Sequence, residues 1–272
     1  MSNKLRHPFH IVDSSPWPAH TAFTALGLAA GLIMWFHINR VELLLVSLTS
    51  LLSLLQQWWR DINREGNYMG IHAALVQLGL RLGMLLFIAS EALFFISFFW
   101  AYFHMVMSPR VEIGSSWPPI GIVPLNPLGV PLLNTIILIT SGLSITWSHY
   151  SLIDGMHREA ADTLLITIIL GVYFTILQAL EYKEAAFSIS DSVYGSTFYL
   201  TTGFHGVHVI VGTLFLIATL ARLKIGRFSR VRHFGFEASA WYWHFVDVIW
   251  LFVYMSIYWW GGKFWSNLIL KY

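Results

Sequence analysis

The chain has 272 residues, of which 56% are hydrophobic and 11% charged, and its formal net charge is +2. Soluble domains are roughly a quarter charged, so a chain this apolar lacks the polar residues needed to cover its own surface. Lipid is therefore its expected solvent. The small net charge argues against nucleic acid as a partner. The absence of cysteine excludes disulfides, thiolate metal sites and cysteine nucleophiles.

Seven apolar runs approach the roughly 20 residues that a helix needs to cross a bilayer core about 30 Å thick. Open strands would leave unpaired backbone groups in lipid, so we predict an all-α bundle of seven transmembrane helices. The third helix is expected to begin before Leu82, near His72. The runs are Ala19–Phe36, Leu43–Trp59, Leu82–Phe103, Val130–Tyr150, Thr163–Leu180, Phe198–Ala221 and Trp241–Trp260.

The first two runs are joined only by His37–Glu42 and are predicted to form a helical hairpin. Aromatic and basic residues follow the second run, where a helix would reach the lipid headgroups. Cationic side chains at that level attract anionic lipids. We therefore predict a lipid contact among Trp58, Trp59, Arg60, Arg64 and His72.

The third run contains Glu91, and the seventh contains Asp247, the only other formal charge in the seven runs. An ionisable group inside a membrane is costly and is usually functional. Glu91 lies about 15 Å along a helix from Arg81, too far for contact. Three interpretations stay open: a protonated acid bonded to a neighbouring helix, a proton relay or gate, and a contact with lipid or a partner. The predicted partner is His208, because it lies at a similar depth in the sixth helix.

In the sixth run, His205 and His208 are three residues apart and share one helix face. Such a pair can ligate a metal only if other helices add ligands, and no second histidine pair at matching depth is evident. Neutral histidines bonded across helices are therefore the favoured interpretation, and we predict no metal site. Gly203, Gly206 and Gly212 are expected to flatten this face for close helix packing.

Six basic side chains follow the sixth run in the loop Arg222–His233, which predicts a second headgroup contact. A plain topology signal is the competing interpretation, and the two are compatible.

At the start of the seventh run, His244 and Asp247 are three residues apart. They are predicted to neutralise each other near a membrane face, or to orient a metal ligand or a base.

Lysine and arginine are distributed unequally between the two sets of loops, and this bias sets orientation. With seven spans, eleven lie on the side of the N-terminus and five on the other side, which places the N-terminus inside and the C-terminus outside. The eleven are Lys4, Arg6, Arg60, Arg64, Arg81, Arg158, Arg222, Lys224, Arg227, Arg230 and Arg232; the five are Arg40, Arg110, Lys183, Lys263 and Lys271.

Several segments, in order along nearly the whole chain, resemble the subunit III family of haem–copper cytochrome c oxidases. The third run carries SEALFFISFFWAYFH at 90–104, with its glutamate. The others are HPFHIVDSSPWP at 7–18, WWRD at 58–61, WPPIGI at 117–122, PLLNTIILITSG at 131–142, AAFSISDSVYGS at 185–196, TTGFHGVHVIVGT at 201–213 and WYWHFVDVIWLFVYMSIYWWGG at 241–262. The match is to mitochondrially encoded rather than bacterial forms.

The resemblance implies helices 1–2 (about 19–59) and helices 3–7 (about 72–260) as two sub-bundles around a V-shaped cleft that holds phospholipids. It also implies a multi-pass protein of the mitochondrial inner membrane, with its N-terminus on the matrix side. The chain would pack chiefly on subunit I, which carries the haems and copper, and on other oxidase subunits. It would bind no redox metal itself, would stabilise the catalytic core, and would support proton uptake and oxygen access.

The resemblance also assigns residues. Glu91 matches the family's carbodiimide-reactive glutamate, and the lipids expected are phosphatidylglycerol, phosphatidylethanolamine and cardiolipin. With these matches the predicted lipid-binding set comprises Trp58, Trp59, Arg60, Arg64, Glu65, His72, Arg81, Trp100, His205, Arg222, Lys224 and Arg227.

Three alternatives are weighed from the residues alone. A secondary transporter should show repeats or broken helices with charges near the midplane, and only Glu91 and Asp247 are present. A retinal-type receptor needs a lysine inside a span, and all five lysines lie outside the runs. A haem-bearing electron carrier needs axial ligands within the bundle, and the 12 histidines keep that class open.

Overall fold

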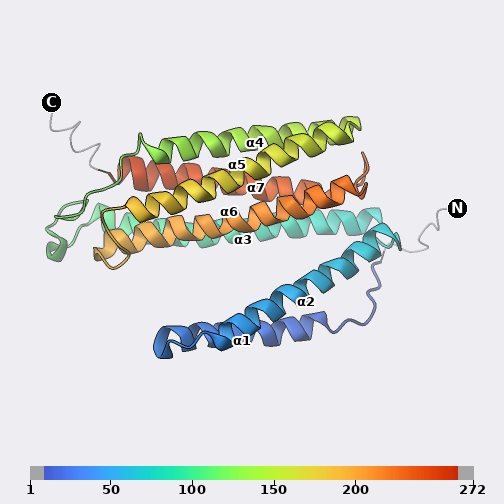
Figure 1. The fold of residues 1–272 in the computed structure, drawn as a ribbon, viewed down its shortest axis with the longest axis horizontal. Helices are drawn as coiled ribbons and strands as arrows, with labels where there is room; N and C mark the ends of the chain where they lie inside the picture. Colours follow the sequence, from blue (N-terminus) through green and yellow to red (C-terminus); the bar gives the residue numbers. More distant parts are fainter. Residues whose placement is uncertain (1–8, 263–272) are drawn as a thin grey trace. The chain divides into compact units, whose positions relative to one another are not determined.

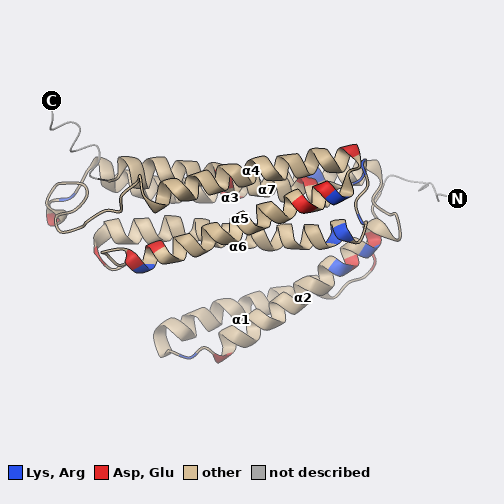
Figure 2. Cartoon of the chain, turned by 45° about the horizontal axis from the view of Figure 1, so that its top comes forward, with Lys and Arg blue, Asp and Glu red and all other residues tan. Residues whose placement is uncertain are grey.

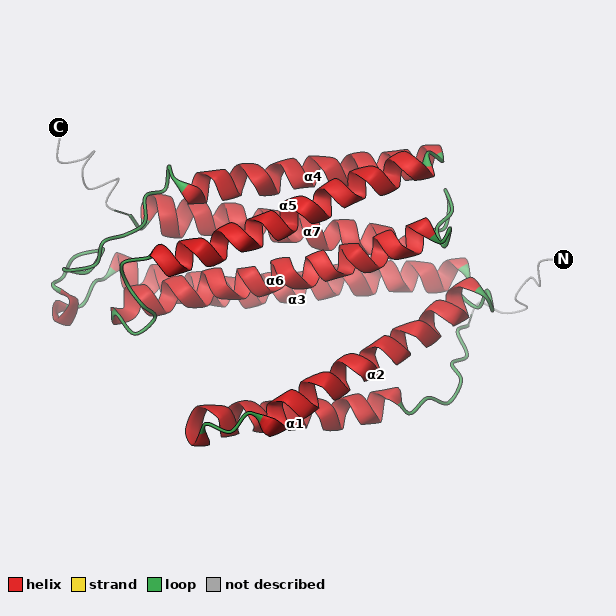
Figure 3. Cartoon of the chain, viewed as in Figure 1, coloured by secondary structure: helices red, strands yellow, loops and turns green. Residues whose placement is uncertain are grey.

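A computed structural model describes residues 9–262, and these residues form seven long α-helices and no strand (Figure 3). This confirms the predicted all-helical class. The helices are α1 (Trp17–Ile38), α2 (Glu42–Asn67), α3 (Ala74–Met107), α4 (Val130–Asp154), α5 (His157–Glu184), α6 (Ser192–Lys224) and α7 (Phe234–Val253). A short 3-10 helix, η1 (Val111–Ile113), follows α3, and a π-helix, η2 (Tyr254–Trp260), follows α7.

Two compact units divide the chain. Unit 1 is Met1–Leu80 and contains α1, α2 and the first turns of α3. Unit 2 is Arg81–Tyr272 and contains the rest of α3 together with α4 to α7 (Figure 1). Lys4, Arg6, Lys263 and Lys271, which enter the predicted charge bias, lie outside the described residues, as do the first two residues of the 7–18 motif.

Six helices are long and apolar enough to cross a membrane: α1, α3, α4, α5, α6, and α7 with its π-helical extension. The exception is α2, because hydroxyl and amide residues, including Gln56 and Gln57, interrupt its apolar part and charges follow it. Lysine, arginine, aspartate and glutamate lie mainly toward the helix ends, and the long middle parts of α4, α5 and α6 carry none (Figure 2). The membrane crossing by α2 thus stays a prediction.

The helices extend beyond the predicted apolar runs at most ends. The runs mark the part that lipid would surround, whereas a helix continues wherever its backbone groups stay paired. The third helix begins at Ala74, close to the predicted start. Proline near the start of α1 and of α4 fits the first turn, where its missing N–H costs no hydrogen bond. Gly155 ends α4 in the left-handed conformation, with φ of 84°.

Within unit 1, α1 and α2 pack as the predicted hairpin. Gly31, the only buried residue of α1, lies directly against the backbone of α2. A Cβ atom at position 31 would lie 2.6 Å from the backbone nitrogen of Leu44. Nearby, Gly27 faces the hydroxyl of Ser47. The crossing of the two helices therefore depends on glycine at position 31.

Within unit 2, α4 packs against α5 and α7, and α6 packs against the same two helices. Buried indoles link α7 to α4, since Trp243 donates to Ser141 at 2.8 Å and Trp250 donates to Thr135 at 3.0 Å. Small side chains allow this close packing, which is usual between membrane helices. Gly212 lies against Trp243, as predicted for a close-packed face.

The other two glycines of the predicted flat face do not pack. A Cβ atom on Gly203 or Gly206 would meet nothing within 4 Å.

The seventh predicted run is not a single α-helix, because the last seven residues of that run form the π-helix η2. A π-turn shifts carbonyl groups out of the usual ladder, and the Tyr102 hydroxyl of α3 donates to the carbonyl of Ser256 at 2.9 Å.

The Gly31→Ala substitution should destabilise unit 1, because the added methyl group forces the backbones of α1 and α2 apart. Overpacking of this kind costs about 1–3 kcal/mol. The matched control is Gly83→Ala in α3, where a Cβ atom meets nothing within 4 Å. Thermal denaturation of the purified complex should show earlier loss of this chain for Gly31→Ala only. Equal thermal stability of the two variants would contradict the close approach.

Candidate functional site

The first predicted pair of residues lies together in unit 2. Nε2 of His208, on α6, is 2.8 Å from Oε2 of Glu91, near the middle of α3. The side chain of Glu91 is 25% exposed and that of His208 is 11% exposed. Glu91 is therefore partly buried.

The hydrogen bonds of His208 restrict the charge of the pair. Its Nδ1 lies 2.7 Å from the carbonyl oxygen of Phe204, so Nδ1 carries a proton and donates it. A neutral ring then presents a lone pair at Nε2, which accepts a proton from an uncharged Glu91. A charged ring would instead donate to a carboxylate. In both arrangements the pair as a whole has no net charge.

Aromatic rings surround this pair. The ring centroid of Phe95 is 4.9 Å from that of His208, and the ring of Tyr242 stacks on His208 at 6.4 Å. Phe94 and Phe245 complete the contacts, each at 6.4 Å. Surroundings of this kind solvate ions poorly and so favour the neutral arrangement over the ion pair.

The second histidine of the sixth helix has a packing role. His205 is 1% exposed, and its Nε2 lies 3.1 Å from the carbonyl oxygen of Val246 on α7. This agrees with the favoured interpretation of a histidine bonded across helices, and it leaves no surface for a lipid.

The predicted pair of His244 and Asp247 on α7 is only loosely formed, because Nδ1 of His244 lies 3.9 Å from Oδ2 of Asp247. His244 also contacts Thr146, at 3.3 Å.

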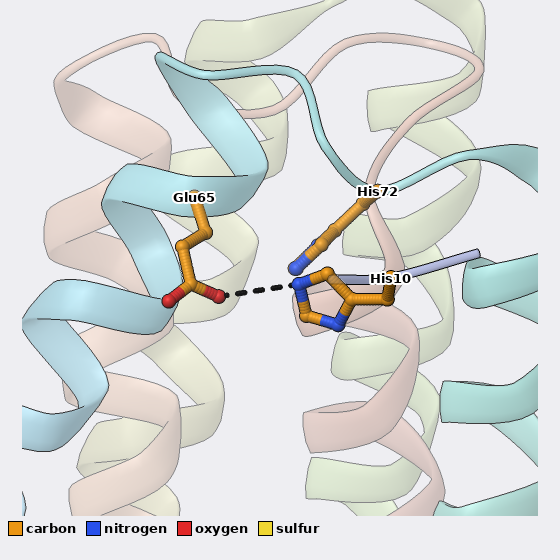
Figure 4. Close-up of side chains that lie close together, drawn as sticks. All are labelled: His10, Glu65 and His72. Carbon is orange, nitrogen blue, oxygen red and sulfur yellow. Dashed lines mark ion pairs between the residues drawn. The ribbon is translucent and has the colours of Figure 1, made fainter. Parts of the chain in front are cut away.

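A histidine–carboxylate cluster lies in unit 1 beyond the end of the α2 apolar run (Figure 4). Nε2 of His10 is 3.4 Å from Oε2 of Glu65, and the ring of His72 meets that of His10 edge-on at 5.2 Å. The side chain of Gln77 donates to the carbonyl oxygen of His72 at 3.1 Å. Figure 4 shows the three side chains converging from the segment before α1, from α2, and from the loop before α3.

Two groups of unit 1 have shifted pKa values. Burial lowers the pKa of His72 below its ordinary 6.5, positive charge on His10 lowers it further, and the Glu65 carboxylate raises it. The pKa of Asp61 is lowered mainly because Trp17 donates its indole N–H to the carboxylate at 2.7 Å. Stability from the Asp61 contact is present above the ordinary pKa and is lost as pH falls through the lowered value.

The cationic end of α2 is open to its surroundings. Trp59 is 59% exposed, the side chain of Arg60 is 58% exposed, and Arg64 is exposed, whereas Trp58 and Glu65 are half-buried. Among the described residues, Arg60 pairs only with its neighbour Asp61, at 3.3 Å. This surface combines exposed indole with exposed guanidinium, which is the combination expected at the headgroup level.

The end of α6 in unit 2 carries a second cationic group. The Arg222 guanidinium lies 4.7 Å above the ring of Phe228. Its Nε atom is buried and has no hydrogen-bond partner among the described residues. Lys224 is exposed, and Arg227 is half-buried. A buried donor of this kind needs an acceptor, and a phosphate oxygen is the type of acceptor that guanidinium groups bind best.

Two other members of the predicted lipid set differ from each other. Arg81 makes a two-point ion pair with Glu237 on α7, with both N–O distances 2.8 Å, so its charge is already neutralised within unit 2. Trp100 on α3 is 75% exposed and presents its indole outward. Arg81 is therefore primarily a link between helices, whereas Trp100 is available to lipid or to a partner chain.

Sequence reasoning missed two polar groups of unit 2. Glu181 is 4% exposed and accepts a hydrogen bond from the Tyr258 hydroxyl at 2.6 Å. His149, His233 and Glu237 also converge, with one ligand atom from each lying within 4.8 Å of the others. The spacing of His233 and Glu237, four residues apart, is a signal that could have indicated half of this cluster.

The fold and these sites define a multi-pass helical membrane protein whose mid-span carboxyl is paired with an imidazole and whose helix ends are cationic. The family model described as "Cytochrome c oxidase subunit III" matches residues 7–262. The chain is 56% identical over 262 residues to "Cytochrome c oxidase subunit 3" of Drosophila yakuba, covering 96% of this chain and 100% of that protein. It is 60% identical over 256 residues to the subunit of the same name from Ornithorhynchus anatinus, covering 94% and 98%.

The chain therefore belongs to the cytochrome c oxidase subunit III family, and it is a subunit of that oxidase. The findings give no support to the transporter alternative.

The lowered pKa of His72 can be tested by its carbethoxylation rate against pH, followed by mass spectrometry of the intact complex. The rate should reach half its maximum below pH 6.5, because burial favours the neutral ring. His10→Asn should move this midpoint up and Glu65→Gln should move it down, since they remove opposite influences. A midpoint above 6.5, or shifts in the same direction, would refute the electrostatic account of this cluster.

Proposed function

We propose that this chain is a non-catalytic core subunit that packs on subunit I of the oxidase, stabilises it and supports its proton uptake. The observation that carries the proposal is the Glu91–His208 pair, which joins α3 to α6 within two membrane spans at 2.8 Å. Haem and copper are assigned to the partner subunits, and no electron passes through this chain.

The pair supports this role by fixing the relative depth of two long helices. A hydrogen bond between two polar groups in an apolar region resists separation, because each group alone would be left without a partner. We propose that Glu91 is uncharged and donates its proton to Nε2 of His208. A neutral acid is also the species that an apolar carbodiimide attacks, which agrees with the family's reactive glutamate at this position.

The cationic ends of α2 and α6 are proposed to hold phospholipid headgroups, each within its own unit. Support comes from the exposed Arg64 and Trp59 in unit 1 and from the unpartnered Nε of Arg222 in unit 2. Phosphatidylglycerol and cardiolipin supply anionic phosphates, and phosphatidylethanolamine supplies a zwitterionic one. His205 and Arg81 are left out of this proposal, because the first is buried and the second is already paired.

We propose a multi-pass protein of the mitochondrial inner membrane, with the N-terminus on the matrix side and the C-terminus on the intermembrane-space side. The charge bias of eleven to five supports this orientation if α2 is counted as a span. The length of α2, 26 residues, is sufficient for a crossing.

Lipid binding can be tested with Arg64→Ala and Arg222→Ala, made separately and together. A headgroup charge held by one arginine is worth about 1 kcal/mol, so each variant should hold its lipid roughly fivefold more weakly. Quantitative mass spectrometry of phospholipid retained after detergent purification measures the loss. Arg110→Ala, at an exposed arginine beyond α3, is the matched control. Equal lipid in all variants would place the contacts elsewhere.

The role of Glu91 can be tested with Glu91→Gln, which keeps a hydrogen-bonding side chain of the same size. We expect assembly and most electron transfer to survive, and carbodiimide labelling of this chain to disappear. Glu112→Gln, at an exposed glutamate of η1, should leave the labelling intact. Labelling that persists in Glu91→Gln would contradict the assignment, and loss of electron transfer would show that the carboxyl itself takes part in turnover.

A further inference from the structure

A group of nitrogen and oxygen ligands lies where the end of α4 meets the start of α7, apart from the carboxyl pair and the cationic helix ends. His149 belongs to the last turns of α4, His233 is the residue before α7, and Glu237 lies in the first turn of α7. All three belong to unit 2. His233 and Glu237 are four residues apart, whereas His149 is 84 residues before His233, so the fold brings the third ligand to the other two.

Two of the three spacings between these atoms match a tetrahedral zinc site, and the third lies within 4.8 Å. Nε2 of His149 lies 3.3 Å from Nε2 of His233, and the latter lies 3.4 Å from Oε1 of Glu237. Zinc binds imidazole nitrogen and carboxylate oxygen at about 2.0–2.2 Å, which puts neighbouring ligands of a tetrahedron about 3.3–3.5 Å apart. Two histidines and one glutamate also form a recognised zinc ligand set, with the fourth position left to water.

The orientation of each ligand is fixed by a second contact. Nδ1 of His233 lies 3.0 Å from the carbonyl oxygen of Ser229, so this nitrogen donates and the lone pair of Nε2 points into the cluster. Arg81 binds Glu237 from outside through both carboxylate oxygens, at 2.8 Å each. The ring of His149 stacks on Phe236, with centroids 5.5 Å apart. Outer contacts of this kind are typical of metal ligands.

Protons satisfy this arrangement only in part when both rings are neutral. One N–H from His149 can then serve the lone pair of His233. The Glu237 carboxylate accepts from Arg81, and a direct bond to it from Nε2 of His233, at 3.4 Å, would need a charged ring. A divalent cation at the centre accepts from all three ligands at once. The side chains are largely buried, at 7% for His233 and 12% for Glu237, while residues 229–232 beside them are exposed and offer access.

We propose that His149, His233 and Glu237 form a zinc-binding site that joins α4 to α7. The ion is bound by two neutral imidazoles and one carboxylate, and water fills the remaining position. Because Arg81 offsets the charge of Glu237, the imidazole nitrogens contribute most of the affinity. The site is independent of the proposed Glu91–His208 pair and of the lipid contacts.

The test measures zinc bound to the intact purified oxidase by equilibrium dialysis followed by elemental analysis. The variants His149→Gln and His233→Gln should each lose one zinc ion per complex relative to the unsubstituted enzyme. His157→Gln, at an exposed histidine at the start of α5, should keep it. Equal zinc in all four proteins, or loss in a His72→Gln variant instead, overturns the proposal.

A second measurement needs no substitution and so stays informative if the variants fail to assemble. Zinc should protect His149 in the intact oxidase from carbethoxylation, as measured by mass spectrometry, and should leave His157 reactive. X-ray absorption at the zinc edge should then show mixed nitrogen and oxygen ligands at about 2.0–2.2 Å. Unchanged reactivity of His149 in saturating zinc overturns the proposal.

Discussion

The hydrocarbon core of a membrane contains no water to hydrogen-bond polar groups, so each one inside this chain needs a partner within the protein. This requirement explains the contacts that join the helices of unit 2. The Glu91 carboxyl meets His208, and the buried indoles of Trp243 and Trp250 each meet a hydroxyl on α4. Hydrophobic packing alone would not set helix depth in lipid, because lipid tails are as apolar as the side chains. The polar pairs set it instead.

Toward the helix ends the requirement relaxes, and the charges appear there. The cationic groups differ in how far the chain itself satisfies them. Arg81 donates two hydrogen bonds to the carboxylate of Glu237, whereas Nε of Arg222 is buried without a hydrogen-bond partner among the described residues. The first arrangement strengthens the bundle, and the second favours an external phosphate. The ligands of the proposed zinc site show the same difference. Each ligand is held by a contact on its outer side, whereas the lone pairs of the three ligands converge at the centre of the site.

Much of this architecture could be predicted from the sequence, because lipid imposes a simple rule of length and apolarity. The helices and the contact of Glu91 with His208 followed from run length and from depth along antiparallel helices. Helix ends were harder, because helices continue past the lipid-facing part. The span assigned to α2 rests on an apolar run diluted by polar residues.

Features that depend on which face a side chain occupies could not be read from spacing. Gly212 packs against an indole while Gly203 and Gly206 do not, although all three lie in one short segment of α6. His149 and His233 are 3.3 Å apart in space and far apart in sequence, so spacing could not indicate their approach, and the absence of a metal site stays a prediction. The π-turns of η2 likewise have no signal in composition or periodicity.

The central claim is that the carboxyl in the middle of α3 is uncharged because its partner is a neutral imidazole in apolar surroundings. Infrared difference spectroscopy of the intact oxidase at pH 7, with Glu91→Gln as the reference, tests it most directly. The account predicts a protonated carboxyl C=O band that is present in the unsubstituted enzyme and absent from the variant. A carboxylate band that disappears in Glu91→Gln would show that Glu91 is ionised, and would contradict the account.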